Sequence, residues 1–125
     1  MADPTAITVQ SVDAPFDTIA AGGADFTFAQ GDASNGNTFA CTGRELLLLS
    51  NESGGAATVT ITSVDDEKNR SEDITDYSMA NGDFAVFGVG LTNSKGWRSS
   101  SGTIRITVSD ADLKVAVLRL PAGYP

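Results

Sequence analysis

Short stretches in which hydrophobic and polar residues alternate recur along the chain. Residues 58–62 read Thr-Val-Thr-Ile-Thr, and residues 103–108 read Thr-Ile-Arg-Ile-Thr-Val. Because successive side chains of a strand point to opposite faces of its sheet, each stretch predicts a strand with one apolar and one polar face. We expect the inward-facing residues to be buried together: Val59, Ile61, Ile104, Ile106, Val108, Val115 and Val117.

Two other stretches are apolar at successive positions rather than at every second one. Residues 46–49 are four leucines, and residues 113–120 are apolar except for Lys114 and Arg119. Such runs are typical of central strands that are covered on both faces. They also fit a strand whose second face is covered by a partner chain.

Residues that favour turns separate these stretches, at intervals of eight to twelve residues, as in all-β proteins. Asn81-Gly82 is the strongest β-hairpin signal. Residues 65–79 are the one piece that suits a helix or an irregular segment. We therefore predict a single antiparallel β-sandwich, jelly-roll-like, with seven to nine short strands.

The 125 residues suffice for one domain with its own core. Residues 1–20 differ from the rest, because they hold two of the four prolines and no full strand pattern. They are either an N-terminal arm that lies on something else or the first edge strand, and residues 21–125 form the sandwich domain.

Composition narrows the possible chemistry. The formal net charge is −8, which repels the phosphates of nucleic acids. The chain has no histidine and one cysteine, Cys41, so histidine-based catalysis, histidine-bound zinc and an internal disulfide are excluded. We expect no enzymatic activity, no cofactor, no resident metal and no nucleic-acid partner.

The first residues lack the basic and apolar regions of a signal peptide, and the longest apolar run, residues 46–49, is far too short to cross a membrane. We therefore expect no membrane partner and synthesis in a cytoplasm. The single thiol of Cys41 fits such a reducing compartment, where it is most simply a small buried apolar residue.

Three charged clusters are candidate sites, each with a simpler interpretation. Asp65-Asp66-Glu67 offers carboxylates for calcium, but the spacing matches no EF-hand and a solvated loop is the better interpretation. Arg44-Glu45 is expected to be an ion pair at a strand end. Trp97-Arg98 combines two residue types that are common at interface hot spots, although Trp97 could equally be a lid over the core.

The order and spacing of five stretches are similar to those of a known protein family. These stretches are residues 39–51, 57–62, 81–88, 96–108 and 112–121. Together they resemble a family of small phage structural proteins that are encoded near head genes, with the last two stretches similar to that family's closing hairpin. The resemblance implies a β-sandwich that decorates or cements a capsid. It implies the major capsid protein as partner, and the outer surface of a virion, assembled in a bacterial host, as location.

A closed homotrimer at a point where three capsomers meet suits such a cement. We expect the N-terminal segment to contact the shell, because its apolar residues follow too weak a pattern for all of them to be buried in its own sheet. The alternative function is a carbohydrate-binding or host-adhesion module of a head or tail fibre. The predicted capsid or subunit contacts are Pro4, Ile7, Val9, Phe16, Trp97 and Arg98.

Overall fold

The computed structural model describes residues 4–12, 25–64, 73–90 and 96–120, and within these ranges it contains strands and no helix. Nine strands are described in chain order: β1 (Thr5–Ala6), β2 (Val9–Ser11), β3 (Asn37–Ala40), β4 (Arg44–Asn51), β5 (Ala57–Thr62), β6 (Ile74–Met79), β7 (Phe84–Gly90), β8 (Thr103–Val108) and β9 (Leu113–Arg119). The predicted all-β class is confirmed.

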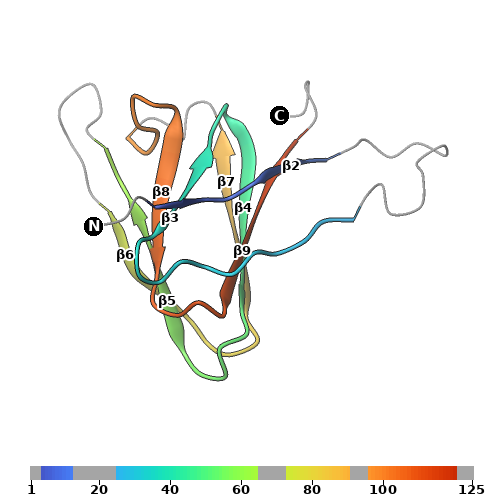
Figure 1. Ribbon diagram of the computed structural model, residues 1–125, viewed down its shortest axis with the longest axis vertical. Helices are drawn as coiled ribbons and strands as arrows, with labels where there is room; N and C mark the ends of the chain where they lie inside the picture. The colour runs from blue at the N-terminus through green and yellow to red at the C-terminus, as the bar shows by residue number, and fades with distance from the viewer. Residues whose placement is uncertain (1–3, 13–24, 65–72, 91–95, 121–125) are drawn as a thin grey trace.

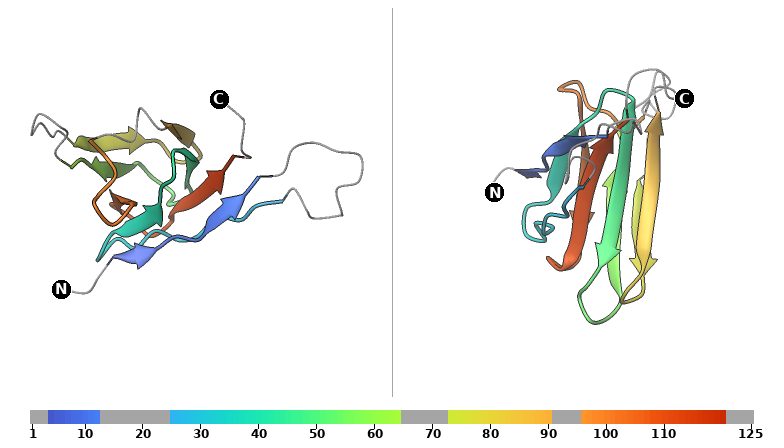
Figure 2. Two further views of the ribbon diagram at one scale, coloured as in Figure 1. Left: turned by 90° about the horizontal axis from the view of Figure 1, so that it is seen from above. Right: turned by 90° about the vertical axis from the view of Figure 1, so that its right-hand side faces the viewer.

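The strands form two sheets that pack face to face (Figures 1 and 2). One sheet has the order β1-β3-β8-β5-β6, and the other has the order β2-β9-β4-β7. We call them the five-stranded and the four-stranded sheet. The arrangement confirms the β-sandwich, and the jelly-roll connectivity stays a prediction.

The sandwich is not antiparallel throughout, because the N-terminal segment joins both sheets in parallel. β1 pairs with β3, and β2 pairs with β9. Between them, the amide of Ile7 donates a hydrogen bond of 2.8 Å to the carbonyl of Thr38. Residues 5–11 thus cross from one sheet to the other along one edge of the sandwich (Figure 1).

The core consists of the inward-facing residues of both sheets. All seven residues expected to be buried together, from Val59 to Val117, belong to this one cluster. In β5 and β8 the alternation is as predicted, since the valines and isoleucines are buried while the threonines and Arg105 point outward. Phe39, Leu47, Leu49 and Met79 are the other large side chains of the cluster.

Two expectations about connections are wrong. Asn81-Gly82 does form a turn, with Gly82 at a φ of 88°, but it links β6 and β7, which lie in different sheets. β8 and β9 also lie in different sheets, so the chain's last two strands are not a hairpin. In both places the chain crosses the sandwich, which brings the apolar faces of consecutive strands opposite each other.

The helical alternative for residues 65–79 is wrong for its second half. Ile74–Met79 is a strand at the edge of the five-stranded sheet, with Met79 opposite Ala57 and Tyr77 opposite Val59. The pairing shifts register between Val59 and Ile61, where β6 is irregular. Residues 65–72, including the Asp65-Asp66-Glu67 cluster, lie outside the described residues.

Candidate interaction surface

The four-stranded sheet has an apolar outer face as well as an apolar inner face. In β4, Leu47 and Leu49 point into the core, so Leu46 and Leu48 point outward. Leu46 pairs with Gly88 of β7 and Leu118 of β9, and Leu48 pairs with Val86 and Ala116. Directly opposed residues share a face. We name this surface the apolar face, and it consists of Leu46, Leu48, Phe84, Val86, Gly88, Ala116 and Leu118.

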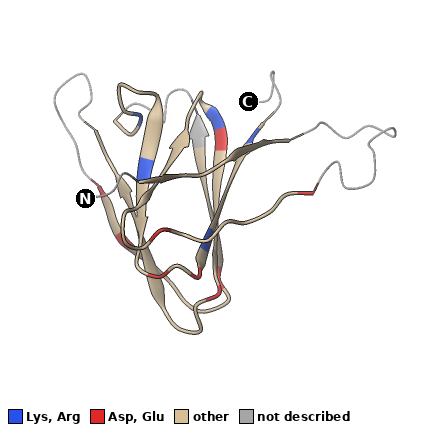
Figure 3. Cartoon of the chain, in the orientation of Figure 1, with Lys and Arg blue, Asp and Glu red and all other residues tan. Residues whose placement is uncertain are grey.

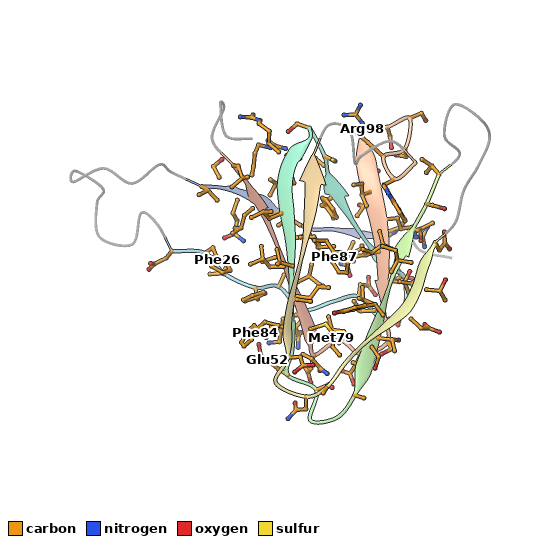
Figure 4. All side chains as sticks on the ribbon, turned by 180° about the vertical axis from the view of Figure 1, so that it is seen from behind. Phe26, Glu52, Met79, Phe84, Phe87 and Arg98 are labelled. Carbon is orange, nitrogen blue, oxygen red and sulfur yellow. The ribbon has the colours of Figure 1, made fainter. Side chains whose placement is uncertain are left out.

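The apolar face is open to solvent at β7. Phe84 is 77% exposed and Val86 is 60% exposed, whereas Leu46, Leu48 and Leu118 are half-buried by their neighbours. Figure 4 shows Phe84 and Phe87 on opposite sides of β7, with Phe87 directed toward the other sheet. Such large apolar side chains on a strand in water mark a contact surface rather than a core.

Phe26 and Phe28 extend the apolar face beyond β9. Ala29 bridges Val115 in antiparallel fashion, which places this segment alongside β9. The two rings pack edge to face with centroids 5.4 Å apart, and Phe26 is 41% exposed. The side chain of Gln10 holds the segment by accepting from the amide of Thr27 and donating to its carbonyl. Figure 4 shows Phe26 and Phe84 on the same, outer side of the sheet.

The outer face of the five-stranded sheet is polar. We name it the threonine face, and it consists of Thr38, Thr58, Thr60, Thr62, Arg105 and Thr107. Figure 3 shows that both sheets carry charge: β8 has a cation in mid-strand, β4 is charged near its start, and β9 has a cation near each end. No residue of β7 is charged.

The predicted contact residues are divided between the core and the surface. Ile7 is buried in the core cluster, and Val9 is half-buried against it. Ile7 therefore contributes to the core rather than to an exposed contact surface, because the edge between the two sheets buries its side chain. Pro4 is half-buried, and Phe16 lies outside the described residues.

Trp97 and Arg98 lie in the turn before β8. Trp97 is half-buried and packs against the core cluster, as a lid would. Arg98 is exposed, and its Nη1 donates a hydrogen bond of 3.3 Å to the carbonyl of Cys41. The thiol of Cys41 is buried, and burial raises its pKa. These residues lie at a strand end and do not belong to the apolar face.

Glu45 is the most heavily hydrogen-bonded side chain described, and its role is structural. Its carboxylate accepts from the amides of Thr42, Gly43 and Arg44, from the hydroxyl of Thr42, and from Nε of Arg119. Burial alone would raise the pKa of Glu45, but Arg119 and the Thr42 donors outweigh it and lower the pKa to about 2. The expected ion pair thus forms between Glu45 and Arg119 across the sheet, rather than with Arg44.

Two other polar side chains, the buried Asn51 and the partly exposed Asp32, also stabilise turns. The side chain of Asn51 donates to the carbonyls of Gly55 and Met79, tying two loops together. Asp32 accepts from Thr5, Ser34 and Asn35, and these hydrogen bonds lower its pKa. Within residues 4–12, 25–64, 73–90 and 96–120, no cluster of three or more acidic or cysteine side chains is placed to hold a metal.

Sequence reasoning left the apolar face undecided: it expected the second face of residues 46–49 and 113–120 to be covered either within this chain or by a partner chain, and it did not connect that face with Phe84 and Val86. The sequence signal for this face is the run of four leucines, which supplies both faces of β4 with apolar side chains.

Comparisons with known proteins found no relative: no family model, no curated protein and no solved structure matches this chain. Among the described residues, no helix is long and apolar enough to cross a membrane.

Proposed function

We propose that this protein decorates a phage head, binding the outside of the assembled capsid through the apolar face and cementing neighbouring coat subunits. The single observation that carries the proposal is the outward exposure of Phe84 and Val86 on β7, with Leu48 of β4 directly opposite Val86. The sequence resemblance to small phage structural proteins supplies the identity of the partner.

The apolar face is large enough for adhesion but small for a permanent interface. Its three strands β4, β7 and β9, about 4.8 Å apart and about seven residues long at about 3.4 Å per residue, span roughly 350 Å². A standard interface buries about 800 Å² on each partner. A cement with such a face gains strength by touching more than one coat subunit, which only an assembled lattice offers.

The charge of the chain supports the same function. A net charge of −8 keeps the free protein soluble despite its exposed aromatic residues. The residues of the apolar face are uncharged, and Arg44 and Lys114 lie at its margins on the same side of the sheet, so its adhesion depends mainly on removing apolar surface from water. Binding to heads should therefore change little between low and high salt.

The carbohydrate-binding alternative has weaker support. Sugar recognition commonly uses aromatic rings that lie flat on a surface, but Trp97 packs against the core. Tyr77 packs edge to face on Phe87, with ring centroids 5.6 Å apart. We therefore favour a protein partner over a glycan.

The test replaces one cross-strand pair on each outer face by glutamine. Leu46→Gln with Leu118→Gln alters directly opposed residues of the apolar face, and Thr60→Gln with Thr107→Gln alters directly opposed residues of the threonine face. Each labelled protein is titrated onto mature heads, unexpanded heads and free coat subunits of the phage that encodes it, at two salt concentrations.

We expect the leucine variant to bind mature heads about a hundredfold more weakly, which corresponds to about 1.4 kcal/mol for each lost leucine. The threonine variant should bind like the unmodified protein. Equal affinity of the unmodified protein for heads and free subunits would contradict a lattice-reading cement. Binding that disappears in salt would place the contact on charged residues such as Arg98.

A further inference from the structure

The sandwich has four edge strands, and three of them are protected against pairing with another chain. β1 and β2 are only two and three residues long. β6 carries Asp76 at a φ of 52°, where the register shifts, and the Asp76 amide donates to the hydroxyl of Thr60. Short strands, charges and bulges are the usual means of blocking an edge.

β7 has none of these protections. It runs for seven residues, Phe84 to Gly90, without a charge, a proline or a shift in its pairing with β4. Figure 2 shows it as the outermost strand beside β4. A long, uncharged edge of this kind is a template for another strand.

The backbone of β7 offers a row of hydrogen-bonding groups at this edge. The carbonyl of Asp83 accepts from the amide of Asn51, so odd-numbered residues of this strand bond to β4. In an antiparallel pair, alternate residues point their backbone groups to opposite sides. The amides and carbonyls of Phe84, Val86 and Gly88 therefore point away from β4, and no backbone partner within the described residues accepts or donates there.

The outward side chains of β7 are complementary to a second copy of the same strand. From Phe84 to Gly88, the outer-face positions are occupied by phenylalanine, valine and glycine. When two copies pair antiparallel about Val86, Val86 lies opposite Val86 of the other copy. Phe84 of each copy then lies opposite Gly88 of the other copy, and the missing side chain of the glycine leaves room for the phenylalanine ring. The twofold axis produces this pair twice. Aromatic residues that cover a glycine across two strands stabilise a sheet edge.

We propose that two copies of this protein pair through β7, antiparallel and about a twofold axis at Val86. The two four-stranded sheets then form one eight-stranded sheet, and the two apolar faces become continuous. Their combined area is roughly 700 Å², close to the about 800 Å² that each partner buries in a standard interface. In this pairing, the C-terminal end of β7, which lies near Arg44, is next to the N-terminal end of β7 of the other copy, which lies near Asp83.

A strand that pairs with its own copy in antiparallel fashion requires a twofold axis. The assembly is therefore a dimer, in place of the homotrimer expected from the sequence. The inference concerns self-association alone and does not depend on the capsid as partner of the apolar face.

The experiment uses charge at the twofold position. Val86→Lys and Val86→Glu each set like charges directly opposite one another, which destabilises the pairing. Val86 is 60% exposed, so both variants should fold. We expect the unmodified protein to sediment as a dimer, each variant alone as a monomer, and a 1:1 mixture of the two as a dimer. Thr107→Lys and Thr107→Glu, on exposed β8 positions of the threonine face, are the matched controls and should remain dimers.

Amide exchange of the unmodified protein gives an independent measurement that does not need the variants to fold. The amides of Phe84, Val86 and Gly88 should exchange slowly at high concentration and faster on dilution. A monomer at millimolar concentration, a trimer, a dimer unaffected by charge at Val86, or a dimer in which these three amides exchange quickly would each overturn the proposal.

Discussion

The two outer faces of this sandwich are built on the same inner pattern and differ completely in what they present to their surroundings. β5 and β8 alternate strictly, so burying their valines and isoleucines leaves threonines outside. β4 is apolar on both faces, so burying Leu47 and Leu49 leaves Leu46 and Leu48 outside. The outer face of the five-stranded sheet is therefore polar, whereas the outer face of the four-stranded sheet is apolar. The core and the apolar face are thus formed by alternate residues of the same strands.

The edges on one side of the sandwich show the same contrast. β6 and β7 are neighbours in sequence and lie at the same side of the molecule, where Tyr77 packs on Phe87. β6, on the polar sheet, is irregular and carries Asp76. β7, on the apolar sheet, is regular and uncharged. The sheet with the apolar face is therefore also the sheet whose edge strand is regular and uncharged.

The largest expected effect separates the two faces of β4 by the same substitution. Leu47→Ala, at 1% exposure, should lower the free energy of unfolding by about 3 kcal/mol, because it leaves a cavity in the core. Leu48→Ala, on the apolar face, should cost about 1 kcal/mol or less, since solvent fills the space. Urea unfolding of both variants measures the difference. Equal costs would mean that the apolar face is covered.

The second prediction concerns the one acidic side chain on the inner side of this apolar sheet, Glu45. Its pKa of about 2 lies below the ordinary value of 4.5, so its ionised form stabilises the fold. This stabilisation is complete above pH 4.5 and is lost as the pH falls toward 2.

Glu45→Gln should therefore lower the free energy of unfolding at pH 7 by about 3 kcal/mol, which is 1.36 kcal/mol for each unit of pKa difference. The variant should also lose most of the change in stability between pH 4.5 and pH 2. Unfolding curves across this range make the comparison. A variant that retains the full acid transition would show that another carboxylate controls it.

The smallest expected effect is at the protected edge. Asp76 has a left-handed backbone, which aspartate tolerates better than alanine does. Asp76→Ala should cost about 1 kcal/mol, and Asp76→Gly should change stability by about 0.5 kcal/mol or less. Thermal melts of the two variants measure this difference. If alanine and glycine behave alike, the left-handed geometry contributes nothing to the stability of this edge.

Alternation in sequence was enough to predict β5 and β8 and the inner face that they share, but not β6. Val59, Ile61, Ile104 and Ile106 lie where their pattern placed them, because a one-residue shift would expose all of them together. The pattern did not show which strands are neighbours. Asn81-Gly82 predicts a hairpin from local turn geometry, but the apolar faces of β6 and β7 are buried only when the two strands lie in opposite sheets.

The sequence by itself determined that this protein is all-β, that its core is made of alternating residues, and that four leucines in a row would present two apolar faces. Only the tertiary structure decided which of those faces is the core and which is the surface. That choice depends on sheet order, because β4 buries the face that opposes the five-stranded sheet. Likewise, β7 is an edge strand because of pairings between residues that are far apart in the chain. The local sequence pattern does not specify such pairings.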